Sequence, residues 1–595
     1  MGFGCKRLQS FCRIRLSSLL TPARRSWLRA MLPWLLAAVP LAVGFTILYV
    51  EQETPTWYWD YANYHEKFKE LKPLLYDGPI SFLAAIRTSV AESQHNYTAV
   101  VPLFAGRLLF GSQRVAYIVS LVLFYLLPAG LLMTLLTRRA WGLAWQGTSG
   151  LAPLLAAWIY TPFWAPTLRG HPDLVCVFPL ALASLLLLRS RYLLRGGPVH
   201  AAGIGLLLWC SFLLRRHTLF SIGGLLVSSL LFAGLILAFR RWRGQPIPFW
   251  TWLSNGCCLL VGLVVPALLV QHGLVSQIVK PAYASTFAAY QQDLAAQSLE
   301  ILRFCGPVLL LSAALGGLLA AFWRADGVLF LLLVPPLALV GFQQAQAPSD
   351  HHLLVFSLFL FPAVCAPFVL IGRLPALRCR RLLNAVWLAL LASFHLHTFA
   401  WSSRLAAAVP APLARLAPSR TYPPLRLASY ASVRSLSQQL RTLLETSRAG
   451  ATVAVLASSE QLNMHILRAV SSRRLRPHLQ SVSDVDRRDA FRLDLLEADY
   501  VIATDPPAVH LGEQNQRVIT IPSAALRNAN NPFGASYTRL SHLQHRLADG
   551  RTISVYRRIR PRSQAEVQWL HAQLRRHYPS WGRTAEMIGR SRTQL

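Results

Sequence analysis

Asp60 is an acidic side chain that lies a few residues after an apolar stretch, within the aromatic and polar segment 57–66 (WYWDYANYHE). A carboxylate that is partly shielded from water can act as a general base, and aromatic neighbours predict a raised pKa for it. The alternative is that the three preceding aromatic residues form an interfacial belt and that Asp60 caps a helix. Glu66, a possible substrate contact, is predicted to face elsewhere on that helix.

Asp173 is a second candidate catalytic residue, in the polar segment 169–173 (RGHPD) between two apolar segments. Ionisable residues at membrane depth cost free energy, so they usually serve a function. The same reasoning makes His171 a possible substrate contact. The pair Pro172–Asp173 is also typical of an ordinary helix start, which is the alternative interpretation.

Three basic residues are candidates for binding a phosphate group. Arg215 and Arg216 interrupt the apolar run 199–239, and two adjacent guanidinium groups can bind phosphate oxygens. Simple snorkelling of both side chains towards water is the alternative. Lys280 is the third candidate, and Tyr283 beside it is a possible substrate contact.

Asp350, His351 and His352 form a polar group at the start of a later apolar segment. They are possible substrate contacts, and their side chains include good metal ligands. Adjacent histidines project in different directions from a helix, however, so a polar helix cap is the alternative. The first long loop contains no DxD motif. We therefore expect no metal cofactor, although a divalent cation stays possible.

The composition of the chain shows which elements must position these residues. Of its 595 residues, 54% are hydrophobic and only 14% are charged, with a mean hydropathy of +0.38. A soluble protein is usually less apolar and more charged, so the sequence predicts an integral membrane protein. Apolar segments close to the length of a membrane span number about eleven. They lie at about 31–50, 115–136, 150–167, 174–194, 199–214, 218–239, 254–272, 304–323, 327–342, 353–371 and 383–400.

The formal net charge of +34 comes largely from arginines that cluster in alternate loops. That pattern follows the positive-inside rule and predicts a cytoplasmic N-terminal tail, 1–30, before the first span. The long loop 51–114 and everything after the last span then lie outside the cytoplasm. Because the positive charge follows the expected membrane topology of the chain, we expect no nucleic-acid partner. The nine cysteines form no CxxC pair, so neither a disulfide framework nor a cysteine zinc site is expected.

Two regions outside the predicted membrane domain, 31–400, have structure of their own. Residues 61–75 are predicted to form an amphipathic helix on the membrane surface. A linker, 401–424, leads to a predicted extracytoplasmic α/β domain, 425–595. Its expected strands are 451–457, 500–504, 517–521 and 552–556, and its expected helices are 460–470 and 564–576. The predicted fold class is therefore an α-helical polytopic membrane protein with a C-terminal α/β domain.

This arrangement resembles the GT-C superfamily of polytopic glycosyltransferases, on the cytoplasmic N-terminus, Asp60 in a long first outer loop, roughly eleven spans and the C-terminal domain. It is most similar to bacterial protein mannosyltransferases, aminoarabinose transferases and lipopolysaccharide galacturonosyltransferases. The resemblance implies inverting transfer of a sugar from a polyprenyl-phosphate donor to a lipid, polysaccharide or protein acceptor. It also implies Asp60 as the base, Asp173 as a second acid, and Arg215, Arg216 or Lys280 as the phosphate ligands.

The resemblance further implies a multi-pass protein of the bacterial cytoplasmic (inner) membrane, in contact with membrane lipids. No phosphate-binding glycine loop of the GxxxxGK or GxGxxG type occurs, which disfavours a nucleotide-sugar mechanism. The alternative function is a transporter or flippase of a lipid-linked glycan. Transporters often show paired repeats and polar residues at the bilayer midplane, whereas the acids here lie at predicted outer ends.

Overall fold

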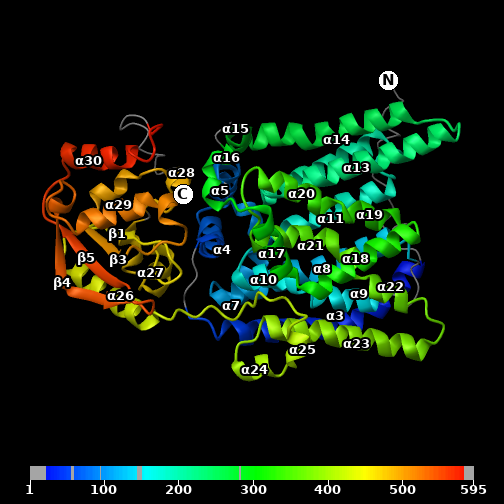
Figure 1. Cartoon of the computed structure of the whole chain (residues 1–595), viewed down its shortest axis with the longest axis horizontal. Helices are drawn as coiled ribbons and strands as arrows, with labels where there is room; N and C mark the ends of the chain where they lie inside the picture. Colours follow the sequence, from blue (N-terminus) through cyan, green and yellow to red (C-terminus); the bar gives the residue numbers. More distant parts are fainter. Residues whose placement is uncertain are drawn as a thin grey trace.

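The structure is a computed structural model that describes residues 22–54, 59–93, 95–143, 150–279, 283–480 and 482–581. A large helical bundle is joined to a smaller domain that contains a β-sheet (Figure 1). The fold class predicted from the sequence is confirmed. Residues 1–21 of the predicted cytoplasmic tail lie outside the described residues.

All eleven predicted apolar segments are helical. Within the described ranges, six helical stretches are long and apolar enough to cross a membrane, or seven if the bent pair α17 and α18 is one span. The other helical segments of the bundle are shorter or less apolar than this. The bundle helices are α3 (Pro22–Val50), α7 (Arg114–Leu121), η3 (Val122–Leu126), α8 (Leu127–Ala140), α9 (Leu151–Trp158), α10 (Thr161–Arg169), α11 (Leu174–Arg189), α12 (Pro198–Leu214), α13 (Thr218–Trp242), α14 (Phe249–Val270), α17 (Leu294–Cys305), α18 (Pro307–Phe322), α19 (Asp326–Leu332), α20 (Val334–Gln343), α21 (Asp350–Val364), α22 (Ala366–Ile371) and α23 (Leu377–Thr398).

Proline marks the start of a new helix at two breaks in the bundle. The segment 150–167 divides into α9 and α10, with Pro162 in the first turn of α10. Helices α17 and α18 meet at an angle of 98°, where Gly306 has φ +79° and Pro307 begins the second helix. Proline favours a helix start and disfavours a helical residue before it, so a new helix begins at each of these positions. The run 199–239 forms two helices, α12 and α13, as predicted.

Helices α12 and α14 pack closely through glycine. An ideal Cβ added to Gly262 of α14 would overlap the carbonyl oxygen of Ala202 in α12, whereas one added to Gly256 would meet no atom within 4 Å. We expect Gly262→Ala to lower the free energy of unfolding by about 1–3 kcal/mol, because the two backbones must separate. Unfolding in detergent micelles measures this. Gly256→Ala, in the same helix, is the matched control and should not destabilise; an equal loss in both variants would contradict close packing at Gly262.

The segment after α3 folds against one end of the bundle. Helix α4 (Trp59–Tyr76) contains the predicted amphipathic helix and buries Tyr64, Phe68 and Leu71. Its first turn faces the other way, since Trp59 and Tyr61 pack against the core of the C-terminal domain. Helix α4 therefore lies between the bundle and that domain (Figure 1). The segment continues through α5 (Pro79–Glu92), η1 (Tyr97–Ala99), η2 (Val101–Leu103) and α6 (Phe104–Phe110).

The predicted linker is packed on the bundle. It contains α24 (Ser403–Ala407) and α25 (Ala411–Ala414). The Tyr49 hydroxyl donates to the carbonyl oxygen of Tyr422 at 2.7 Å, and Thr54 exchanges hydrogen bonds with Leu425 and Leu427. The linker thus returns beside the end of α3. The C-terminal domain lies at the Val50 end of α3, opposite the end at which α3 begins (Figure 1).

The C-terminal domain is a five-stranded mixed sheet with the strand order β2-β1-β3-β5-β4. Strand β1 pairs in parallel with β2 and β3, while β5 pairs antiparallel with β3 and β4. The strands are β1 (Val453–Leu456), β2 (Leu479–Gln480), β3 (Tyr500–Asp505), β4 (Tyr537–Arg546) and β5 (Thr552–Arg558). The predicted strands 451–457, 500–504 and 552–556 are confirmed, whereas β2 and β4 were not predicted.

Helices cover both faces of this sheet, because alternate side chains of a strand point to opposite faces. Val453 and Val455 face one core cluster, and Ala454 and Leu456 face the other. Helices α26 (Tyr430–Glu445) and α27 (Met464–Val470) cover the first face. Helices α29 (Arg517–Leu526) and α30 (Gln564–Arg575) cover the second. The short helical elements are η5 (Arg476–His478), α28 (Asp486–Asp489), η6 (Leu493–Glu497), η7 (Glu513–Asn515) and η8 (Gly534–Ser536).

The predicted strand 517–521 is wrong, since these residues begin α29. Their β-branched side chains favour a strand locally. In the fold, the Asp486 carboxylate accepts hydrogen bonds from the first backbone N–H groups of the helix, those of Arg517 and Val518, at 2.9 and 2.8 Å. Val518 and Ile519 are then buried against the sheet. A distant cap and tertiary packing therefore override the local preference.

Candidate functional site

The predicted acidic and basic residues meet where four segments of the bundle converge. These are the first turn of α4, the loop between α10 and α11, the turn between α12 and α13, and the start of α21. The first turn of α4 also contacts the core of the C-terminal domain, so the site lies at the end of the bundle that faces this domain. Asp60, Asp173, Arg215 and His351, far apart in sequence, thus contribute to one site.

The loop that carries Asp173 is held rigidly. Gly170 has φ +96°, and a side chain at this position would lie 2.6 Å from the Arg114 guanidinium. Tyr117 donates to the carbonyl oxygen of Gly170 at 2.8 Å, and Arg114 donates to that of Arg169 at 3.0 Å. Arg114 is itself paired with Glu53 at 3.1 Å, and both side chains are buried. The loop therefore needs glycine at position 170, and the buried Arg114–Glu53 ion pair supports it.

Asp173 and Arg215 form a buried ion pair. The Arg215 Nε lies 2.9 Å from the Asp173 Oδ1, with side-chain exposures of 5% and 0%. Arg215 also donates a hydrogen bond to the Tyr64 hydroxyl and lies over that ring. Snorkelling of Arg215 towards water is therefore wrong. A buried guanidinium beside a buried carboxylate needs its partner, because unpaired charge in this setting costs several kcal/mol.

Two histidines face the same carboxylate. His171 Nδ1 lies 3.7 Å from one Asp173 oxygen, and His217 Nε2 lies 3.4 Å from the other. Among the described residues, neither of these nitrogen atoms nor Asp173 Oδ2 has a hydrogen-bond partner. Burial lowers the pKa of His171 to about 4 and that of His217 well below its ordinary value. Both imidazoles are therefore neutral near pH 7, and each has a buried nitrogen without a hydrogen-bond partner among the described residues.

Asp60 is the more accessible of the two acids. Its Oδ1 lies 3.1 Å from His95 Nε2, and each side chain is 30% exposed. Burial would raise the pKa of Asp60, but His95 and then Arg215 outweigh burial and hold this pKa well below its usual value. The raised pKa expected from the aromatic neighbours is therefore wrong, since the sequence does not show the distant cations. Asp60 is an ionised carboxylate that orients His95.

Three histidines beside this ion pair could bind a metal. The ligand atoms of His217, His351 and His352 lie within 4.8 Å of one another. However, the backbone N–H of Ser349 donates to His352 Nδ1 at 3.0 Å, so a neutral ring carries its proton on the other nitrogen. The Arg215 guanidinium also lies close by and disfavours a cation. The number of ligands fits a divalent ion, whereas the hydrogen bond from Ser349 to His352 does not.

The remaining site candidates are spread around this centre. His351 stacks on His171 with ring centroids 4.5 Å apart. Asp350 faces the linker, 3.1 Å from Arg420. Arg216 lies over the Phe287 ring at 5.0 Å.

Other predicted residues lie away from the centre or outside the described part. Glu66 pairs with Lys69 at 2.8 Å on an exposed face, so it does not join Asp60. Lys280 lies outside the described residues, as do Trp57 and Tyr58 of the predicted aromatic belt. Tyr283 begins α16 (Tyr283–Thr286), before η4 (Ala288–Tyr290), and its side chain is outside the description.

Sequence reasoning missed three residues that complete the site. His95 binds Asp60, Tyr64 binds Arg215, and Arg420 binds Asp350. His95 lies in a polar stretch of the first outer loop, which is a weak signal. Tyr64 follows Asp60 by one helical turn and so faces the same side. Nothing local marks Arg420 among the many arginines of the chain.

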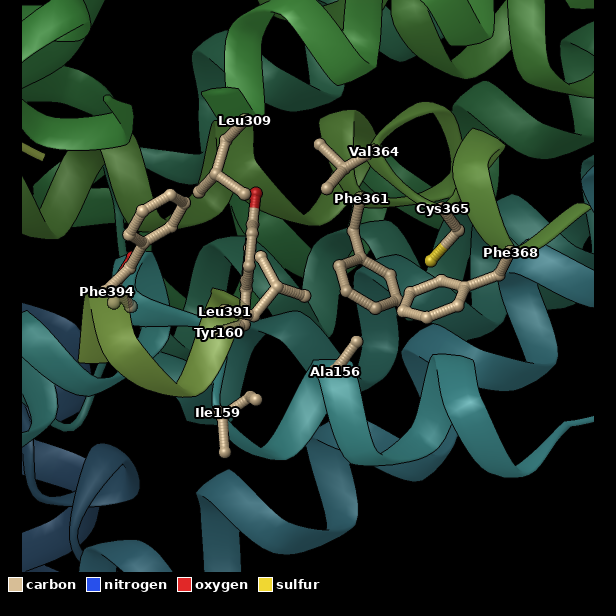
Figure 2. Close-up of a pocket in the computed structure, with 11 residues that line it drawn as sticks. Ala156, Ile159, Tyr160, Leu309, Phe361, Val364, Cys365, Phe368, Leu391 and Phe394 are labelled. Atoms are coloured by element: carbon tan, nitrogen blue, oxygen red, sulfur yellow. The ribbon is translucent and has the colours of Figure 1, made fainter. Parts of the chain in front are cut away.

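A pocket within the bundle offers no comparable chemistry. It is lined by apolar and aromatic side chains, among them Tyr160, Leu309, Phe361 and Phe394, which Figure 2 shows around a small gap. Its volume of about 10 Å³ is that of a single water molecule at most. This gap is a packing defect between helices and is too small for a substrate.

The comparisons with known proteins find similarity in structure alone. No protein-family model and no curated protein matches the chain. Two solved structures of ArnT from Cupriavidus metallidurans, one in the apo state and one bound to undecaprenyl phosphate, are similar at 12% identity and a TM-score of 0.44. In both comparisons the match covers 88% of this chain and 98% of the other.

Proposed function

We propose that this protein is a membrane glycosyltransferase that transfers a sugar, with inversion, from a polyprenyl-phosphate donor to an extracytoplasmic acceptor. The observation that supports it best is the accessible Asp60–His95 pair, set beside the buried Asp173–Arg215 pair at one end of an apolar bundle. A base, phosphate-binding cations and an apolar surface for a lipid chain are the three parts that this reaction needs. The site lies in the bacterial inner membrane with Asp60 on the outer side.

The donor phosphate would lie against Arg215 and Arg216. Guanidinium groups bind phosphate oxygens through two parallel hydrogen bonds and stabilise the charge of a departing phosphate. Lys280, which belongs to the same outer loop as Phe287, would be a further cation. Arg215 is fixed by Asp173, so Asp173 acts as a positioning residue. The polyprenyl chain would lie along the apolar outer surfaces of the helices.

The reaction needs one proton acceptor. The acceptor hydroxyl oxygen attacks the anomeric carbon, the bond from this carbon to the phosphate oxygen breaks, and the polyprenyl phosphate leaves with both electrons of that bond. The Asp60–His95 pair takes the hydroxyl proton. Because the pKa of Asp60 is low, its carboxylate is ionised near neutral pH and holds the His95 imidazole in place. His171 and His217 would bind sugar hydroxyls as neutral groups.

The assay that tests this function uses the protein in proteoliposomes with a polyprenyl-phosphate sugar labelled in the sugar. We expect stoichiometric release of free polyprenyl phosphate as the label moves to an acceptor glycan or lipid. We propose that no metal is required, so release should be unchanged by a chelator. Loss of release with chelator, and its recovery with zinc, would instead assign a metal to His217, His351 and His352.

A transporter or flippase of a lipid-linked glycan is the second candidate. The sharp bend between α17 and α18 favours it, because broken helices are frequent in transporters. The same proteoliposomes separate the two functions. A flippase moves the intact labelled lipid across the membrane without releasing polyprenyl phosphate. That result would overturn the proposed transferase.

A further inference from the structure

A second pocket, which is polar, lies where the C-terminal domain meets the outer loop of the bundle. Its volume is about 260 Å³, and Ala288 and Ala289 of η4 form its bundle side. The domain side comes from α28, η7, the start of α29 and the residues after α30. Beside the pocket, Arg488 donates to the Tyr290 hydroxyl at 2.9 Å and joins the two parts. Helices α16 and α28 lie close to each other at this junction (Figure 1).

Basic side chains outnumber acidic ones in the described lining of this pocket. Arg487, Arg517 and His577 line it, with Asp486 as the one acidic group among the described lining residues. The Asp486 carboxylate is already engaged, because it accepts hydrogen bonds from the backbone N–H groups of Arg517 and Val518 and from the Tyr578 hydroxyl. The Asp486 carboxylate therefore caps the start of α29. Arg517 lies over the Tyr578 ring, 5.8 Å from its centroid, whereas Arg487 and His577 are exposed and can contact an anion.

We infer that this pocket binds an anionic sugar, one that carries a phosphate or a carboxylate group. The guanidinium groups of Arg487 and Arg517 would bind the oxyanion, as arginine does elsewhere. Gln514 and Asn515, which also line the pocket, offer amide groups for sugar hydroxyls. A ligand in this position would contact both the C-terminal domain and the bundle. Binding here does not depend on the proposed transferase activity.

Titration calorimetry on the full chain in detergent micelles tests the pocket, with glucose 6-phosphate, glucuronate and neutral glucose as ligands. At least one of the two anions should bind, and glucose at least about 10-fold more weakly, because each charge-assisted bond contributes about 1.5–3 kcal/mol. A higher salt concentration should weaken the binding of the anion. The preferred anion shows whether phosphate or carboxylate is the recognised group. Equal binding of glucose, or no binding of either anion, would overturn the proposal.

The double variant Arg487→Gln/His577→Gln locates the binding. Both side chains are exposed, so their replacement should leave the fold intact. We expect the affinity for the anion to fall at least about 10-fold. The matched control is Arg473→Gln/Arg474→Gln, which removes two exposed charges of the same domain outside the pocket. Equal losses in the two double variants would show attraction by net charge alone and would contradict a pocket at Arg487.

Discussion

Asp60→Asn should lower turnover about 10²–10⁴-fold while the protein still folds and still binds its donor. Asparagine keeps the size of the side chain but loses the charge that holds the His95 imidazole at 3.1 Å. His95→Gln should lower turnover similarly, and the double variant should lose little more, because the two groups act as one unit. The measurement is single-turnover release of polyprenyl phosphate from labelled donor.

Glu66→Gln provides the control for Asp60. Glu66 lies on the same helix, α4, but is 42% exposed and paired with Lys69, so its replacement should change turnover little. Near-normal transfer by Asp60→Asn, together with complete loss in Asp173→Asn, would place the base on the loop between α10 and α11. Normal transfer by both variants would show that neither carboxylate is needed for proton transfer, and the role proposed for the Asp60–His95 pair would fail.

The apolar segments of the bundle are predictable from the sequence because their signal is local and long. Composition and hydropathy marked all eleven segments, and the interruption at Arg215 correctly divided the run 199–239. The breaks at Pro162 and Pro307 were missed, since an apolar window hides a change of direction. Strand β2 has only two residues, which is too short for any periodic pattern.

The site was predictable as a set of residue types, but its pairings were not. Charged residues at predicted span ends were conspicuous in an apolar chain, which identified Asp60, Asp173 and Arg215. Which of them pair depends on contacts between segments far apart in sequence, such as Asp173 with Arg215. The low pKa of Asp60 depends on His95 in the same way. Local aromatic neighbours therefore indicated the wrong direction of the shift.

Arg215→Gln should lower the free energy of unfolding by about 3–5 kcal/mol, since it leaves the fully buried Asp173 carboxylate without its cation. Asp173→Asn should also destabilise, but the double variant should lose less than the sum of the two single losses, because no charge is then stranded. Unfolding in detergent micelles gives the coupling free energy. Arg216→Gln is the adjacent control: this half-buried side chain should affect stability little, whereas donor affinity should fall by about 1.5–3 kcal/mol. Single losses that add to within about 0.5 kcal/mol would mean that Asp173 and Arg215 do not interact, and Asp173 would then lose its role in positioning the phosphate-binding cation.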